Sequence, residues 1–125
     1  MRTFVARNNR GTEVLVGPKE VEGTFTPGEL LNIAVMVCAG MSADHRFTHL
    51  EGEDAPAELT VVGEPVEGEN RYGKFTVTFT ADLSDLDEAT FAKLQERASA
   101  AVDRGCTIGR TIRNGAQYEF RMESE

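Results

Sequence analysis

The longest apolar stretch of the chain, residues 30–41, most constrains the possible folds, because it demands burial. It is too short to cross a bilayer, which takes roughly 20 apolar residues. Thr26 suits an N-cap, and Pro27 suits the first helical position, where its missing N–H costs nothing. Glu29 lies three residues after Thr26 and completes a capping box. The sequence therefore predicts a helix that begins at Pro27 and is buried on most of its sides.

The other expected elements follow from turn residues and from alternation of apolar and polar side chains. A second helix is expected over residues 84–105, capped either by Asp85 with Glu88 or by Asp87 alone, and stopped at Gly105. Strands are expected over residues 3–6, 12–17, 57–65, 74–81 and 116–122. The resulting order, β-β-α-β-β-α-β, predicts an α+β fold.

Length and charge limit the organisation and the partners. A chain of 125 residues predicts one domain, residues 1–125, with apolar surface that a homodimer could bury. The net charge of −8 argues against a nucleic-acid partner and against an anionic membrane surface. The N-terminus shows no signal-peptide pattern, and two cysteines without one favour a cytoplasmic protein with reduced thiols.

The two cysteines are the candidates for chemistry. Cys38 lies inside the first predicted helix, and Cys106 directly follows the second, 68 positions later. Buried cysteines often serve only as small apolar residues, so both could be packing residues. The C-x-x-C spacing of zinc and thioredoxin-like sites is absent, and His45 is two helical turns from Cys38. We therefore expect neither a metal nor another cofactor, and we expect His45 and His49 to be solvated.

Two segments, FTPGELLNIAVMVCAGM and ERASAAVDRGCTIGRTI, resemble the OsmC/Ohr family of thiol-dependent peroxidases. The resemblance covers nearly the whole chain and is carried by two motifs, one around each cysteine. Their matching residues are Pro27, Leu30, Leu31 and Cys38, then Cys106, Ile108 and Thr111. It implies an OsmC-like fold, with antiparallel sheets packed around a buried central helix, in an intertwined homodimer.

The resemblance also implies a reaction. Cys38 would be the peroxidatic cysteine, which attacks an organic hydroperoxide, and Cys106 the resolving cysteine, with an external dithiol as reductant. Apolar surroundings raise the pKa of a thiol, and lowering it from about 8.5 to about 5.5 takes roughly 4 kcal/mol. The family supplies an arginine from the N-terminal strands. Arg10 is the first candidate for it here and Arg7 the second, although both could be solvated turn residues.

One position departs from the family. The resemblance expects a glutamate ten residues before Cys38, where this chain has Gly28. Glu29 is one residue along, about 100° around a helix, so it cannot point the same way. A water, Glu22 or a different substrate could compensate. The departure leaves open a weakly active or inactive member that binds a small apolar ligand or acts as a redox-responsive dimer.

Overall fold

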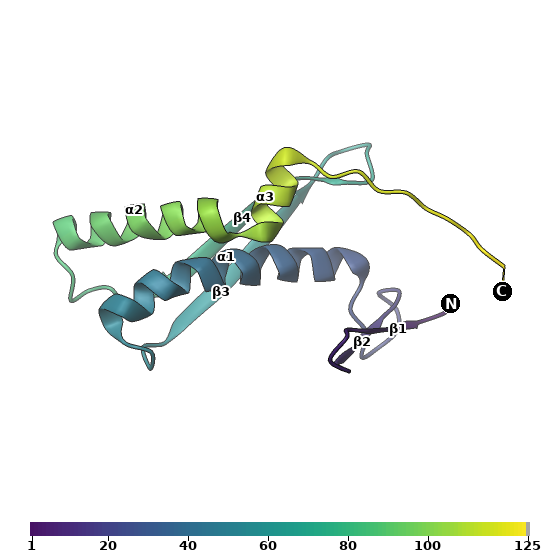
Figure 1. Cartoon of the computed structure of the whole chain (residues 1–125), viewed down its shortest axis with the longest axis horizontal. Helices are drawn as coiled ribbons and strands as arrows, with labels where there is room; N and C mark the ends of the chain where they lie inside the picture. The colour runs from purple at the N-terminus through teal and green to yellow at the C-terminus, as the bar shows by residue number, and fades with distance from the viewer. Residues whose placement is uncertain (125) are drawn as a thin grey trace. The chain divides into compact units, whose positions relative to one another are not determined.

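The computed structural model describes residues 1–124, and the chain divides into two compact units. The first unit comprises residues 1–37 and 59–78. The second comprises residues 38–58 and 79–124. The element order is β-β-α-β-β-α-α (Figure 1). The bounds are β1 Phe4–Arg7, β2 Glu13–Val16, α1 Pro27–Glu51, β3 Ala57–Pro65, β4 Tyr72–Ala81, α2 Glu88–Gly105 and α3 Thr107–Asn114. Among the described residues, no helix has the length and apolarity needed to cross a membrane.

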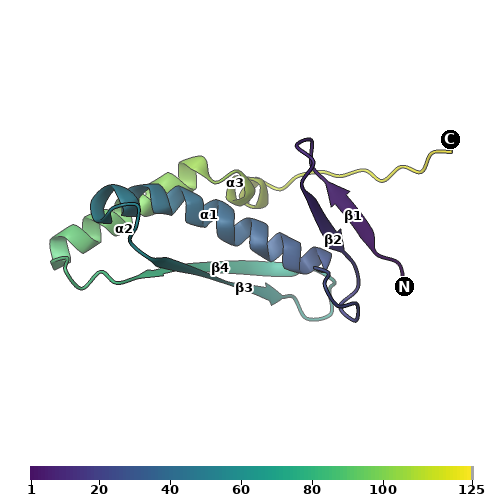
Figure 2. The same ribbon diagram turned by 90° about the horizontal axis from the view of Figure 1, so that it is seen from below.

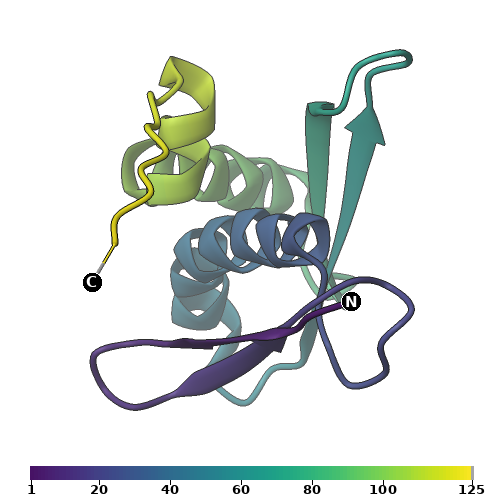
Figure 3. The ribbon, with the colours of Figure 1, turned by 90° about the vertical axis from the view of Figure 1, so that its right-hand side faces the viewer.

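The first unit contains the β1–β2 hairpin, seen at the bottom of Figure 3. The strands pair antiparallel, with Arg7 opposite Glu13, and these two side chains form an ion pair. The turn is held by Asn8, whose Oδ1 accepts hydrogen bonds from the N–H groups of Arg10 at 2.9 Å and Thr12 at 3.0 Å. An asparagine that bonds the backbone two residues ahead is a common turn device. The two predicted N-terminal strands are therefore confirmed.

The start of α1 is the predicted capping box. The N–H of Thr26 donates to Glu29 Oε1 at 2.8 Å, and the N–H of Glu29 donates to Thr26 Oγ1 at 3.1 Å. The helix runs beyond the apolar segment and ends at Glu51. Gly52 follows with φ of 93°, and its N–H donates to the carbonyl of Thr48, which closes the last turn.

The prediction that α1 is buried on most of its sides is wrong for the single chain. Only Val35, Gly40 and Phe47 of this helix are buried. Leu31 is 41% exposed and Met41 is 70% exposed, although both belong to the apolar run. The other elements of the single chain therefore do not cover all the apolar side chains of α1.

The strands β3 and β4 confirm two further predictions. They pair with each other in a two-stranded sheet, whose two long ribbons lie side by side in Figure 2. The connection between them is closed by a hydrogen bond from the N–H of Val66 to the carbonyl of Arg71. In the second unit, Phe79 of β4 meets Phe47 of α1 edge to face, with ring centroids 5.2 Å apart.

The predicted strand at residues 116–122 is wrong. The chain instead forms α3 directly after Cys106, and residues 115–124 have no regular secondary structure. The alternating Tyr118, Phe120 and Met122 are 95%, 79% and 86% exposed. Alternation alone does not make a strand, because a strand also needs a partner edge, and in the described part of the chain each sheet has only two strands.

Candidate active site

Cys106 occupies the junction between α2 and α3 and caps both helices. Its N–H donates to the carbonyl of Val102 at 3.0 Å, which closes the last turn of α2. Its Sγ accepts a hydrogen bond from the N–H of Gly109 at 3.2 Å, as an N-cap side chain does. The residue is 2% exposed. The backbone of two helices therefore fixes the position of this sulfur.

Cys38 lies on α1, half-buried, with its thiol against the first turn of α3. The backbone N–H of Ile108 lowers the pKa of Cys38 and is the largest influence on it. Burial opposes this effect, whereas hydrogen bonds from the Cys106 thiol and from the N–H of Thr107 lower the pKa further. The net direction is downward, toward the thiolate.

The pKa of Cys106 moves the other way. Burial raises it most, because an apolar environment penalises the charged form. The N–H of Gly109 opposes that rise, while the hydrogen bond to Cys38 and the charge on Cys38 add to it. The pKa values of the two thiols thus move in opposite directions, and Cys38 is the more acidic of the two.

The source of this polarity is the N-terminus of α3. The first N–H groups of a helix have no partner within the helix, and the helix dipole adds partial positive charge there. Here the amides of Thr107 and Ile108 act on Cys38, and the amide of Gly109 binds Cys106. Helix N-termini lower thiol pKa values in this way. Both cysteines are free thiols in the structure.

Sequence reasoning missed α3 and therefore missed these donors. A signal was present: Cys106 follows a helix stop, Ile108 and Ile112 are four residues apart, and Gly115 is the C-cap with φ of 73°. Cysteine is not among the usual N-cap residues, so the pattern did not suggest a second helix start.

The predicted arginines lie in the other unit of the chain. Arg10 is in the β1–β2 turn, where Asn8 fixes its backbone, and Arg7 is ion-paired with Glu13. The lowered pKa of Cys38 is accounted for by backbone amides and the Cys106 thiol. The role of Arg10 stays a prediction. Within residues 1–124, no group of three or more His, Cys, Asp or Glu side chains could hold a metal ion.

The structure gives a physical reason for the glycine at position 28. A Cβ placed there would lie 3.0 Å from the hydroxyl oxygen of Tyr72, closer than ordinary contact. The carbonyl of Gly28 also accepts a hydrogen bond from Asn32 Nδ2 at 2.9 Å. Asn32 is the single polar residue of the segment from Leu30 to Val37. Any larger side chain at position 28 would therefore require the Tyr72 phenol to shift.

A model of the family described as OsmC-like protein matches residues 18–121. The chain belongs to the OsmC-like protein family. Curated relatives include uncharacterized proteins of Mycobacterium tuberculosis and Mycobacterium bovis. Each is 40% identical to this chain over 121 residues, which are 97% of this chain and 88% of the relative.

Solved structures support the same OsmC-like, α+β fold. A hypothetical protein from Aquifex aeolicus matches with a TM-score of 0.66 at 17% identity, covering 90% of this chain and 79% of that one. An OsmC-like protein of unknown function from Vibrio cholerae matches with a TM-score of 0.58 at 17% identity, covering 88% and 78%. At this identity the likeness concerns the fold alone.

Proposed function

We propose that this OsmC-like protein is a thiol peroxidase that reduces organic hydroperoxides through Cys38 and Cys106. The observation that carries the proposal is that a free Cys106 thiol caps the N-terminus of α3, whose first amides also lower the pKa of the free Cys38 thiol. A peroxidatic cysteine must be a thiolate that substrate can reach, whereas its resolving partner must stay nearby and protonated until needed. Cys38 is half-buried with a lowered pKa, and Cys106 is buried with a raised one.

In the first step, the Cys38 thiolate attacks the terminal oxygen of the hydroperoxide ROOH. The S–O bond forms as the O–O bond breaks, so Cys38 becomes a sulfenic acid and the alkoxide leaves. The alkoxide takes one proton to become the alcohol ROH. The Cys38 sulfur is oxidised by two electrons, and the peroxide is reduced by two.

In the second step, the Cys106 sulfur attacks the sulfenic sulfur of Cys38, and water leaves with the hydroxyl oxygen and the Cys106 proton. A disulfide results, and an external dithiol reduces it by exchange, returning both thiols. The amide of Gly109 stabilises the Cys106 sulfur as it loses its proton, because that N–H already points at it.

The remaining partners are part of the same proposal. Arg10 is the proposed cation that binds the developing negative charge of the peroxide, and Arg7 is the second candidate. A homodimer is proposed to cover the exposed apolar side chains, such as Leu31 and Met41 of α1. The free thiols suit a reducing compartment such as the cytoplasm.

The experiment follows cumene hydroperoxide consumption with dithiothreitol as reductant. The wild-type protein should turn over, and Cys38→Ser should lose the activity entirely. In a separate reaction without dithiothreitol, Cys106→Ser should react once and keep a sulfenic acid on Cys38, which dimedone traps. Arg10→Gln should lower kcat/KM by about tenfold or more, whereas Arg2→Gln, the same charge loss in the N-terminal segment, should not. A wild-type protein that consumes no hydroperoxide would refute the proposal.

A second candidate function rests on the contact of Gly28 with Tyr72. Without the family's glutamate at this position, the chain could bind a small apolar ligand, or respond to oxidation as a dimer, without turnover. Extraction of the purified protein and mass spectrometry of the extract would reveal such a ligand. Thiols of ordinary reactivity together with a stoichiometric bound lipid would favour this function over the peroxidase.

A further inference from the structure

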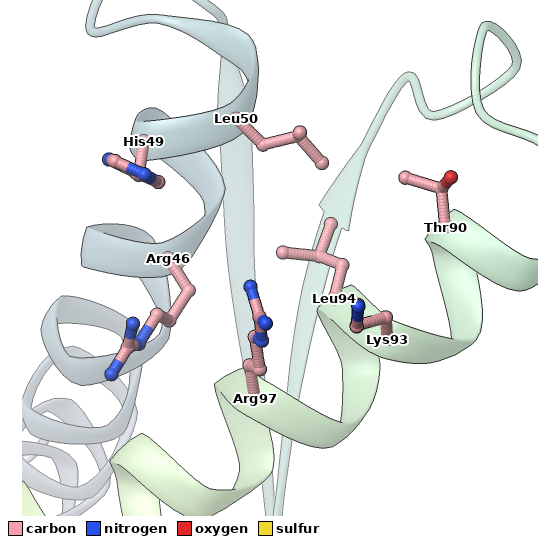
Figure 4. Close-up of a pocket in the computed structure, with 7 residues that line it drawn as sticks. All are labelled: Arg46, His49, Leu50, Thr90, Lys93, Leu94 and Arg97. Carbon is pink, nitrogen blue, oxygen red and sulfur yellow. The ribbon is translucent and has the colours of Figure 1, made fainter.

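A basic cavity lies between α1 and α2 in the second unit, away from the thiols. Its volume is about 90 Å³, enough for a small anion but not for a large ligand. Seven side chains line it (Figure 4). Those from α1 are Arg46, His49 and Leu50, and those from α2 are Thr90, Lys93, Leu94 and Arg97. Arg46 is eight residues beyond Cys38, about 12 Å along the helix.

The cavity concentrates positive charge on an acidic protein. Arg46, Lys93 and Arg97 converge there although the net charge of the chain is −8. The structure records ion pairs within residues 1–124, but none involves these three residues. Cations that line one cavity without a carboxylate among the lining residues repel one another, so an anion bound there would stabilise them.

Arg46, one of the residues that line the cavity, has a buried hydrogen-bond donor. The Nε of Arg46 is buried and has no hydrogen-bond partner among the described residues. A buried, unsatisfied donor costs about 1–3 kcal/mol, more when it carries charge. An acceptor oxygen from a bound anion would remove that cost once the Arg46 side chain turns its Nε toward the cavity. The apolar side chains of Leu50 and Leu94 point toward one another beside it and reduce the screening by water (Figure 4).

We propose that this cavity binds a phosphate group, either inorganic phosphate or the phosphate of a small metabolite. Phosphate fits because guanidinium groups bind its oxygens with paired N–H donors. The residues that line the cavity include two arginines and a lysine, whose N–H donors suit a tetrahedral ion with several acceptor oxygens. A monovalent carboxylate would use fewer of these donors and bind more weakly. The site does not depend on the proposed peroxidase activity.

The test titrates the full-length protein with inorganic phosphate at constant ionic strength, followed by isothermal calorimetry. We expect saturable binding of one phosphate per chain with a Kd below about 1 mM, and at least tenfold weaker binding of acetate. The double variant Arg46→Gln/Arg97→Gln should weaken phosphate binding by tenfold or more. Arg104→Gln is the matched control, because it removes one arginine from α2 outside the cavity.

Two results would overturn the inference. One is the absence of saturation up to 20-fold above the expected Kd (about 20 mM). The other is an equal loss in Arg104→Gln, which would mean that only long-range attraction is measured. If the double variant does not fold by circular dichroism, Arg46→Lys replaces it. That variant keeps the charge but loses Nε, so a Kd within twofold of the wild type would count against the site.

Discussion

At the scale of single residues, Cys106 combines two tasks that are usually separate. It ends one helix with its backbone and begins the next with its side chain. Its thiol also lowers the pKa of Cys38. Helix capping thus fixes its position, and the proposed redox reaction depends on that position. A serine could reproduce the cap but not the disulfide, because only a thiol can attack the sulfenic sulfur.

The pKa of Cys38 leads to a prediction about its reactivity. In Cys106→Ser, where Cys38 is the only thiol, the rate of labelling by iodoacetamide should rise with pH around a midpoint below the roughly 8.5 of free cysteine. In Cys106→Ala the midpoint should move up, because both the hydrogen-bond donor and the cap of α3 are lost. A midpoint at or above the free value in Cys106→Ser would contradict the role of the α3 amides.

Whether alanine at position 28 raises or lowers the free energy of unfolding should depend on the hydroxyl oxygen of Tyr72. Replacing a helical glycine by alanine normally adds about 0.5–1 kcal/mol to the free energy of unfolding. Here Gly28→Ala should be neutral or destabilising, because the new Cβ meets the Tyr72 hydroxyl at 3.0 Å. In Tyr72→Phe the nearest ring atoms remain at 3.7 and 3.8 Å, so the same change should stabilise.

Urea unfolding of the four proteins, with wild type and Tyr72→Phe as the two backgrounds, measures this difference. If Gly28→Ala has the same effect in both backgrounds, the Tyr72 hydroxyl does not limit position 28. In that case Tyr72 would not explain the glycine at position 28.

At the scale of elements, the helix starts follow from local sequence, but the choice between competing caps does not. The capping box of α1 involves only residues 26–29, and it forms as predicted. For α2 two caps were possible, and the structure selects Asp87, whose Oδ1 accepts from the N–H of Thr90 at 2.7 Å. The helix α3 was missed, because its cap is a cysteine and its eight residues provide a short pattern.

The cap of α2 predicts a pH dependence of stability. The hydroxyl and the N–H of Thr90 hold the pKa of Asp87 below its usual value. A carboxylate with a lowered pKa in the folded state stabilises the fold above its unfolded pKa, about 3.9, and this contribution disappears as the pH falls through the folded pKa.

Asp87→Ala should therefore lower Tm by a few degrees at pH 7, and by less near pH 3. Asp87→Asn keeps an acceptor oxygen but does not titrate. At pH 7 its Tm should lie between those of the wild type and Asp87→Ala. Between pH 7 and pH 3 its Tm should fall less than the Tm of the wild type. Thermal unfolding followed by circular dichroism between pH 7 and pH 3 measures both. An equal effect of Asp87→Ala at the two pH values would rule out a role for the charged cap.

At the scale of the whole molecule, the main feature is the large number of apolar side chains that stay exposed in the single chain. Within residues 1–124 the buried hydrophobic residues are Val35, Phe47 and Cys106, whereas Phe4, Val62 and Met41 are 60–70% exposed. Apolar surface of this kind marks an interface more often than open solvent. The family model matches residues 18–121, so Met41 and Val62 lie in the part of the chain that matches the OsmC-like family, whereas Phe4 lies before it.

We expect the protein to sediment as a dimer, at twice the 13.7 kDa of one chain, with an interface of standard size or larger, about 1,600 Å² or more. Met41→Glu should weaken the dimer by at least tenfold, because it buries a charge, while Met41→Leu should leave it intact. Analytical ultracentrifugation across micromolar concentrations measures this. A wild-type monomer at 100 μM would mean that the exposed apolar side chains of the chain serve another partner.

The sequence by itself determined what local interactions control: the capping box, the hairpin turns, the strand alternation at residues 74–81 and the two cysteine motifs. These depend on neighbours a few residues apart, so one chain segment carries the whole signal. Only the tertiary structure decided which groups surround the sulfurs. Cys38 and the amides of α3 are about 70 residues apart in sequence, and their interaction exists only because folding brings a helix N-terminus to a thiol.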